Sequence, residues 1–171
     1  AEEMQITREE QDAFALESHR RAIDAINTGR FEKEICAIPV KQRRGDAVLV
    51  DIDEHPRYNK TEKGYKLAID MAGLAKLPAA FKKDGTVTAG NSSGINDGAA
   101  ALLLANQEAA LNHGYKPKLK WLGSASAGTA PSHFGYGPVP ATQKLLKRFG
   151  LSVDDIGLFE LNEAFAAQAI G

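Results

Sequence analysis

An Asn-Glu pair near the C-terminal end is the first candidate for chemistry in this chain. Asn162 and Glu163 follow an apolar run, residues 156–161, that predicts a buried strand, and the alanine-rich residues after them predict a helix. Open α/β sheets bind ligands beyond the carboxyl ends of their strands, where helix N-termini direct their amides. The Asn162 amide could therefore position a water or stabilise an oxyanion. Asn is also among the most favoured helix N-caps, and the residues taken alone favour simple capping.

A second pattern, Gly-Asn-Ser-Ser-Gly at residues 90–94, formally fits the G-x-S-x-G nucleophile elbow of serine hydrolases. A triad would then have to recruit Asp97 together with His113 or His133. However, residues 86–88 predict a poor buried strand, and Asp97 is too near the serine for the usual layout. A serine hydrolase therefore stays an alternative that the sequence does not favour.

The composition favours a soluble globular protein over a membrane or secreted protein. At 171 residues, with 43% hydrophobic and 25% charged residues, the chain is typical of a soluble globular domain or of portions of two. It has no apolar run of about 18 residues and no basic-then-apolar leader, so we expect no membrane span and no secretory signal. The single cysteine, Cys36, excludes an intramolecular disulfide, suits a reducing compartment, and lies in a strand-like stretch where we expect a buried or half-buried thiol. No histidine or carboxylate set has metal-ligand spacing.

The charge is unevenly distributed along the chain. Residues 30–83 contain 12 basic and 8 acidic residues, whereas the whole chain has a formal net charge of −1. This basic segment has no interleaved aromatic residues, which argues against nucleic acid as a partner. The two remaining interpretations are a lysine-rich solvated region and a site for a small phosphorylated ligand.

In the first half of the chain, the elements that must position these residues begin with a helix. It starts at a capping box, Thr7-Arg8-Glu9-Glu10, and ends near Gly29. Residues 34–40 and 47–52 predict short strands around a turn. Residues 53–83 are irregular, basic and broken by glycine and proline, so we expect an excursion with short helical pieces and no core of its own.

The second half alternates between the two kinds of element. Residues 98–105 fit a helix and a buried central strand equally well. Residues 106–113 and the segment from Pro138 to about residue 149 predict helices. Residues 117–126 and 156–161 predict strands. Strands that alternate with helices predict an α/β layered sheet.

Four motifs, spread over nearly the whole chain, resemble those of the thiolase family. Residues 162–165, Asn-Glu-Ala-Phe, are similar to the family's NEAF motif, and residues 90–100 are similar to its GNASGLNDGAA segment. Residues 135–141 resemble its MGYGPVPA segment without the methionine, and residues 10–15 resemble one of its helices. The sequence is thus identified as a member of this family. Because it begins abruptly at Ala1 and stops within a predicted helix, we expect an internal fragment.

The resemblance implies an acyltransferase with a thiolase-like α/β fold that acts on coenzyme A thioesters. Thiolases interconvert two acyl-CoA molecules with a 3-ketoacyl-CoA and free CoA, through an acyl-cysteine and a Claisen-type carbon–carbon bond. The intact protein would be a cytoplasmic homo-oligomer, a dimer or tetramer, that binds acyl-CoA or CoA and needs no metal or redox cofactor. Asn162 would hold a water that donates to a thioester oxygen, and Glu163 would be a structural carboxylate.

The resemblance also assigns a set of CoA-binding positions. By this resemblance, Arg57 would lie at the adenine and phosphate end, and Phe81 would be a pocket-wall aromatic. Ala89 and Ser93 would touch pantetheine. Phe134 replaces a methionine of many thiolases, and Phe165 would line the acyl and pantetheine pocket. Phe165 could equally be an ordinary core residue. The bulkier Phe134 puts the acyl preference in doubt, and the stretch 58–72 is longer than the family leads us to expect.

Two of the family's catalytic groups are missing from this sequence. Cys36 lacks the surroundings of the nucleophilic cysteine, and none of the four histidines lies in a GHP context. We therefore expect the chain alone to be inactive, as a fragment of a thiolase or as a non-catalytic CoA-binding remnant.

The family also implies a domain layout. Residues 1–29 would be a helix of the N-terminal half, and residues 30–95 would be the loop domain over the CoA site. The chain would return to the N-terminal half at residues 96–117, with 98–105 as a strand, and the C-terminal half would start at residues 118–171.

Overall fold

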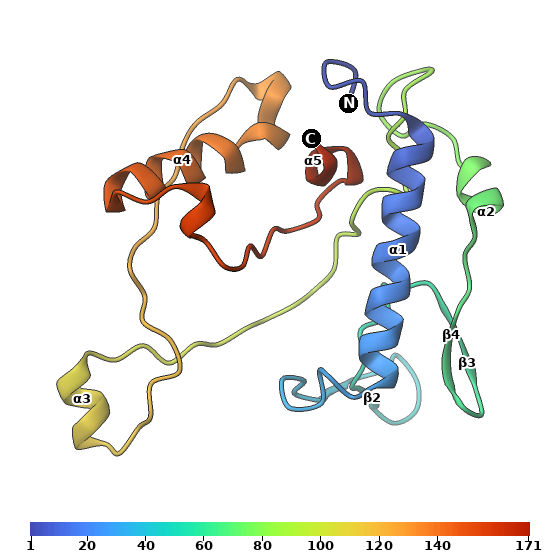
Figure 1. Ribbon diagram of the computed structural model, residues 1–171. Coiled ribbons are helices and arrows are strands. Elements are labelled where there is room, and N and C mark those ends of the chain that lie inside the picture. The colour runs from blue at the N-terminus through green and yellow to red at the C-terminus, as the bar shows by residue number, and fades with distance from the viewer. The chain divides into compact units, whose positions relative to one another are not determined.

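The computed structural model describes all 171 residues and divides them into two compact units. The first unit comprises Ala1–Ile95 with Leu161–Gly171, and the second comprises Asn96–Glu160. Short elements surround one long helix in the first unit, while the second unit is mostly helical turns and irregular chain (Figure 1). The elements in chain order are α1 (Arg8–Asn27), β1 (Ile38–Val40), β2 (Val48–Val50), β3 (Tyr58–Thr61), β4 (Gly64–Leu67), α2 (Met71–Ala75), α3 (Gln107–Asn112), η1 (Pro131–Tyr136), α4 (Pro138–Phe149), η2 (Val153–Asp155) and α5 (Ala166–Ile170).

Helix α1 organises the first unit. The Glu10 amide donates to Thr7 Oγ1 at 3.2 Å and the Thr7 amide donates to a Glu10 carboxylate oxygen at 2.8 Å, so the predicted capping box is confirmed. Helix α2, strand β4 and helix α5 pack against α1. Ala15 and Ile23 of α1 are buried, and Leu74 of α2 is fully buried with 0% of its surface exposed. The core of this unit is therefore small and lies along one side of α1.

Two antiparallel hairpins extend from this core. Strands β1 and β2 pair with Ile38 opposite Val50, which confirms the predicted hairpin, although both strands are shorter than expected. Strands β3 and β4 pair around a two-residue loop and were not expected within the irregular segment 53–83. The side chain of Asn27 fixes β4 to the end of α1, because its amide donates to the Tyr65 carbonyl at 2.7 Å and its oxygen accepts from the Tyr65 amide at 2.8 Å.

In the second unit the predicted helices are confirmed. The Asn106 side chain accepts from the Ala109 amide at 2.8 Å and caps α3. Pro138 occupies the first position of α4, and Gly150 follows its last residue with a φ of +64°, the left-handed conformation that terminates a helix.

The predicted layered sheet does not form within this chain. Residues 98–105, 117–126 and 156–161 are neither strand nor helix, and the sheets consist of the two hairpins alone. A strand needs a neighbour to accept and donate its backbone hydrogen bonds, and no segment of the chain pairs with these three. Their apolar side chains stay in solvent as a result, with Leu102 at 90% and Trp121 at 71% exposure. None of the helices has the length and apolar character needed to cross a membrane.

Candidate functional site

A buried polar network attaches the loop of residues 86–93 to α1. The side chains of Asp12 and Asn91 are only 1% and 2% exposed. Asn91 Nδ2 donates to Asp12 Oδ1 at 2.9 Å and to the Thr86 carbonyl at 3.1 Å, while Asn91 Oδ1 accepts from the Thr88 amide at 2.8 Å. The other Asp12 oxygen accepts from Arg8 Nε at 2.8 Å. Every polar atom of the buried Asn91 side chain is thus paired, which makes the network a stable anchor for the loop.

The same loop binds the C-terminal segment through its backbone. The Ser93 amide donates to the Ala164 carbonyl and the Ala166 amide donates to the Asn91 carbonyl, both at 2.9 Å. These two bonds hold the Gly-Asn-Ser-Ser-Gly motif beside the Asn-Glu-Ala-Phe motif, although the two are far apart in the sequence.

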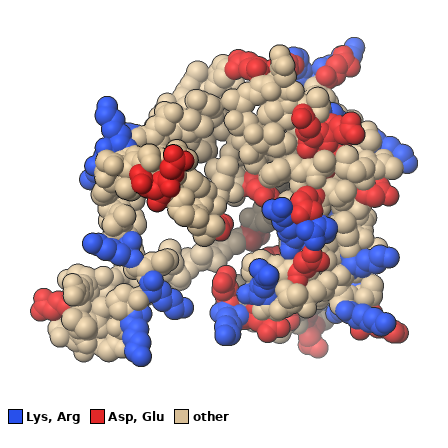
Figure 2. All heavy atoms as spheres, viewed as in Figure 1, with Lys and Arg blue, Asp and Glu red and all other residues tan.

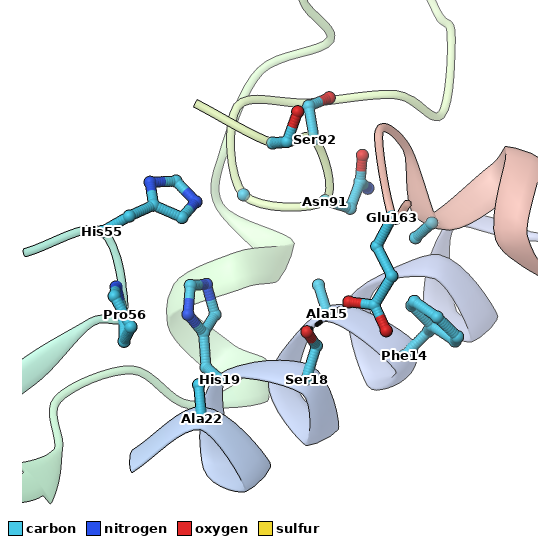
Figure 3. Close-up of a pocket in the computed structure, with 13 residues that line it drawn as sticks. Phe14, Ala15, Ser18, His19, Ala22, His55, Pro56, Asn91, Ser92 and Glu163 are labelled. Carbon is cyan, nitrogen blue, oxygen red and sulfur yellow. Dashed lines mark hydrogen bonds between the residues drawn. The ribbon is translucent and has the colours of Figure 1, made fainter. Parts of the chain in front are cut away.

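A groove with a volume of about 150 Å³ opens between α1, this loop and the chain before β3. Figure 3 shows side chains from all of these segments pointing toward it, with Glu163 reaching back to Ser18. The residues that line it are Phe14, Ala15, Ser18, His19, Ala22, His55, Pro56, Gly90, Asn91, Ser92, Ser93, Glu163 and Ala166. Its lining combines apolar walls with hydroxyl, imidazole and carboxylate groups, a combination typical of small-molecule sites.

Two histidines face each other at the end of the groove near Pro56. The ring centroids of His19 and His55 are 5.8 Å apart, with an angle of 42° between the planes. His19 Nδ1 accepts a long hydrogen bond, 3.4 Å, from the Arg57 amide. Burial lowers the pKa of His19, the positive charges of His55 and Arg57 lower it further, and Glu163 opposes them.

On the visible face of the first unit, basic and acidic side chains are intermixed (Figure 2).

Three of the residues assigned to CoA binding come together in the structure. The rings of Phe81 and Phe165 meet edge to face, with centroids 6.0 Å apart at 74°. Phe165 also pairs with Ser92 in an isolated antiparallel bridge, and Ser93 lines the groove. Ala89 is exposed in the same loop.

Of all the assigned positions, Ser93 alone lines the groove. Arg57 is exposed, and only its neighbours His55 and Pro56 line the groove. Phe134 belongs to η1 of the second unit and is 67% exposed. Asn162 is exposed and does not line the groove.

The local structure predicted around Asn162 is wrong. No strand precedes it, and it caps no helix, because α5 begins at Ala166 with Phe165 at its N-cap. The physical reason is the pairing of residues 164–166 with the loop: the Ala164 carbonyl and the Ala166 amide are engaged by residues 91 and 93 and cannot join a helix that starts at Asn162.

The nucleophile elbow of a serine hydrolase does not form either. Ser92 Oγ donates to the Thr88 carbonyl at 2.7 Å, and no helix follows residue 94. Asp97 and both histidines that a triad would recruit belong to the second unit. Cys36 is exposed, which contradicts the expectation of a buried or half-buried thiol. It precedes the β1–β2 hairpin, whose strand residues are exposed on both faces, so no core is present to bury it.

Several residues that line the groove were not among the predicted site residues. Ser18 and His19 lie on the helix face of Ala15 and Ala22, and this spacing of three and four residues was the available signal. The buried Asp12 gave no comparable signal, because its partner Asn91 is distant in the sequence.

Comparisons with known proteins agree with this geometry. Residues 1–108 match the family described as thiolase, N-terminal domain, and residues 115–171 match thiolase, C-terminal domain. An acetyl-CoA acetyltransferase of Syntrophomonas wolfei is 50% identical over 165 residues, 96% of this chain and 39% of that protein.

Solved structures give the same result. The acetyl-CoA acetyltransferase of Bacillus anthracis superposes with a TM-score of 0.88 at 44% identity, covering 99% of this chain and 40% of that one. Human mitochondrial 3-ketoacyl-CoA thiolase in complex with CoA superposes with a TM-score of 0.84 at 41% identity, covering 99% and 39%. The chain thus spans about 40% of the length of these relatives. With matches to both domains and part of their common fold, the chain belongs to the thiolase family.

Proposed function

We propose that this chain forms part of the coenzyme A site of a thiolase, an acyltransferase that joins two acyl-CoA molecules into a 3-ketoacyl-CoA and CoA, and catalyses the reverse thiolysis. The observation that carries the proposal is the double attachment of the loop 86–93, to α1 through Asp12 and Asn91 and to residues 164–166 through the backbone. This arrangement presents Ser93, Phe81 and Phe165 around one region. A titration calorimetry experiment with CoA tests it directly, and absence of CoA binding by the full-length protein would contradict it.

The proposed contacts follow the chemistry of the ligand. The edge-to-face pair of Phe81 and Phe165 would offer an apolar wall to the acyl and pantetheine chain, and the exposed Ser93 and Ala89 would contact pantetheine. Arg57 offers a guanidinium to the phosphate end, since arginine binds phosphate through paired hydrogen bonds. Phe134, which stands where many thiolases have a methionine, is proposed to affect the acyl preference.

Asn162 is proposed as the catalytic residue of this chain. Asn162 is exposed and precedes Glu163, which lines the groove, and we propose that its side-chain amide binds a water that donates to a thioester oxygen. Such a donor stabilises the oxyanion that develops when a carbon nucleophile or a thiolate attacks the thioester. Glu163 is bound by the Ser18 hydroxyl, which suits a positioning role.

We further propose that the 171 residues alone have no thiolase turnover. The exposed Cys36 has no histidine in hydrogen-bond contact and does not line the groove, so nothing in the chain is placed to carry the acyl group covalently. Cleavage of acetoacetyl-CoA, followed by loss of its enolate absorbance, should be undetectable with the 171-residue protein. Turnover above the uncatalysed rate by this material would refute the proposal.

A non-catalytic CoA-binding protein is the second candidate, favoured by the same absence of a nucleophile. The two differ in one measurement: a thiolase in its full-length form cleaves acetoacetyl-CoA, whereas the binding protein retains CoA affinity without turnover. The layout of residues 1–29, 30–95, 96–117 and 118–171, the homo-oligomeric state and the cytoplasmic location remain predictions. Size-exclusion chromatography with light scattering of the full-length protein tests the oligomeric state.

A further inference from the structure

The histidine pair of the groove has a geometry that the proposed acyl transfer does not use. His19 projects from α1 and His55 from the chain before β3, and their rings approach to 5.8 Å in the groove lining (Figure 3). Because His19 Nδ1 accepts from the Arg57 amide, the neutral ring carries its proton on Nε2, which can donate to a ligand. The bond to Nδ1 is long, 3.4 Å, so little is lost when that nitrogen is protonated.

The charges around the pair disfavour a second positive charge when the groove is empty. His55 and Arg57 lower the pKa of His19 after burial, and Glu163 is the one group that acts in the opposite direction. Glu163 is also the only carboxylate in the groove lining, and it accepts a hydrogen bond from Ser18. An anion bound between the rings would offset the charge of Arg57 and favour protonated imidazoles.

We propose that His19 and His55 form a proton-linked subsite for a phosphate group of the coenzyme A ligand, so that the protein binds this ligand more weakly as the pH rises through neutrality. This inference rests on the proposed function, because it assumes that CoA is the ligand. The Ser18 hydroxyl donates to Glu163 and the Ser92 hydroxyl donates to the Thr88 carbonyl. The side-chain groups of this groove that are left to donate to phosphate oxygens are therefore the two imidazoles and the Ser93 hydroxyl. Binding would take up about half a proton on average between roughly pH 6 and pH 8, because an anion beside the pair favours the protonated imidazole.

Titration calorimetry of the full-length protein at several pH values tests this subsite with three ligands. The dissociation constant for CoA should rise about tenfold between roughly pH 6 and pH 8, the change expected for an average uptake of about half a proton over these two pH units. The 3′-phosphate of CoA itself ionises near pH 6, so dephospho-CoA, which keeps only the diphosphate, serves as the second ligand. Pantetheine, which has no phosphate, is the third and should bind with no dependence on pH.

The three ligands distinguish the possible results. A pH dependence for both CoA and dephospho-CoA assigns the subsite to the diphosphate, and one for CoA alone assigns it to the 3′-phosphate. An equal dependence for pantetheine, or none for CoA, overturns the subsite while leaving CoA binding intact. Failure of all three to bind would overturn the proposed function itself.

Glutamine substitutions locate the effect. His19→Gln combined with His55→Gln should abolish the pH dependence, because glutamine does not gain a proton in this pH range. His55→Gln alone, which leaves α1 unchanged, should reduce the dependence if the double variant does not fold. His113→Gln is the matched control, since His113 does not line the groove, and it should retain the full dependence. An unchanged dependence in His55→Gln and in the double variant would refute the assignment.

Discussion

Replacing Asn91 by alanine should release the loop that carries Ser93. The substitution removes three hydrogen bonds, at 2.9 Å to Asp12, 3.1 Å to the Thr86 carbonyl and 2.8 Å from the Thr88 amide. Two neutral bonds at about 1 kcal/mol each and one charged bond at about 2 kcal/mol give a loss of roughly 4 kcal/mol. Since about 1.4 kcal/mol corresponds to a factor of ten, local opening should become two to three powers of ten more frequent.

Hydrogen exchange of the full-length protein measures this opening, because the Ser93 and Ala166 amides are bonded only while the loop is closed. Both amides should lose roughly a hundredfold to a thousandfold of their protection in Asn91→Ala. Asn59→Ala is the matched control, since Asn59 is exposed on β3, and it should leave both amides unchanged. Exchange of Ser93 and Ala166 within about threefold of the wild type would show that the network does not hold the loop.

Three further outcomes are expected. Gly90→Ala places a Cβ 2.6 Å from the buried Leu74 side chain and should lower the free energy of unfolding by about 1–3 kcal/mol in urea titrations. Gly128→Ala is the control, because no atom lies within 4 Å of its new Cβ, and it should change the free energy of unfolding little. Equal effects of the two substitutions would contradict the packing argument. Thr7→Ala removes the capping box and should cost about 1 kcal/mol, and unchanged helix content and stability by circular dichroism would refute that role. In the full-length enzyme, Asn162→Ala should lower kcat on the order of a hundredfold with unchanged CoA affinity; an unaltered kcat would remove Asn162 from the mechanism.

The elements that the sequence predicted correctly are those with local signals. The capping box at Thr7, the helix predicted over residues 106–113 and the helix start at Pro138 each rest on contacts within a few residues, and the structure contains all three elements. The β3–β4 hairpin was missed because its strands are short and polar. Only Gly64, with a φ of +113° beside a two-residue loop, marked the turn.

The strands of the predicted sheet could not be decided in the same way. Residues 98–105 consist of glycine, alanine and leucine, which suit a helix by propensity and a central strand by burial. Which of the two forms depends on distant partners, and this chain supplies none, so the segment adopts neither. Alternating strands and helices therefore predict a sheet here, but the strands form only when other segments supply their hydrogen-bond partners.

The residues of the two motifs differ in burial, and the sequence does not show which of them are buried. Asn91 is 2% exposed and has every side-chain polar atom bound, whereas Ser93 and Ala89 in the same loop are exposed. A buried, saturated amide has no donor left for a ligand, so Asn91 can act only as an anchor. Asn162 is the opposite, an exposed amide that caps no helix. Asn162 is therefore the residue that we propose to bind the water, whereas Asn91 holds in place the loop that lines the groove.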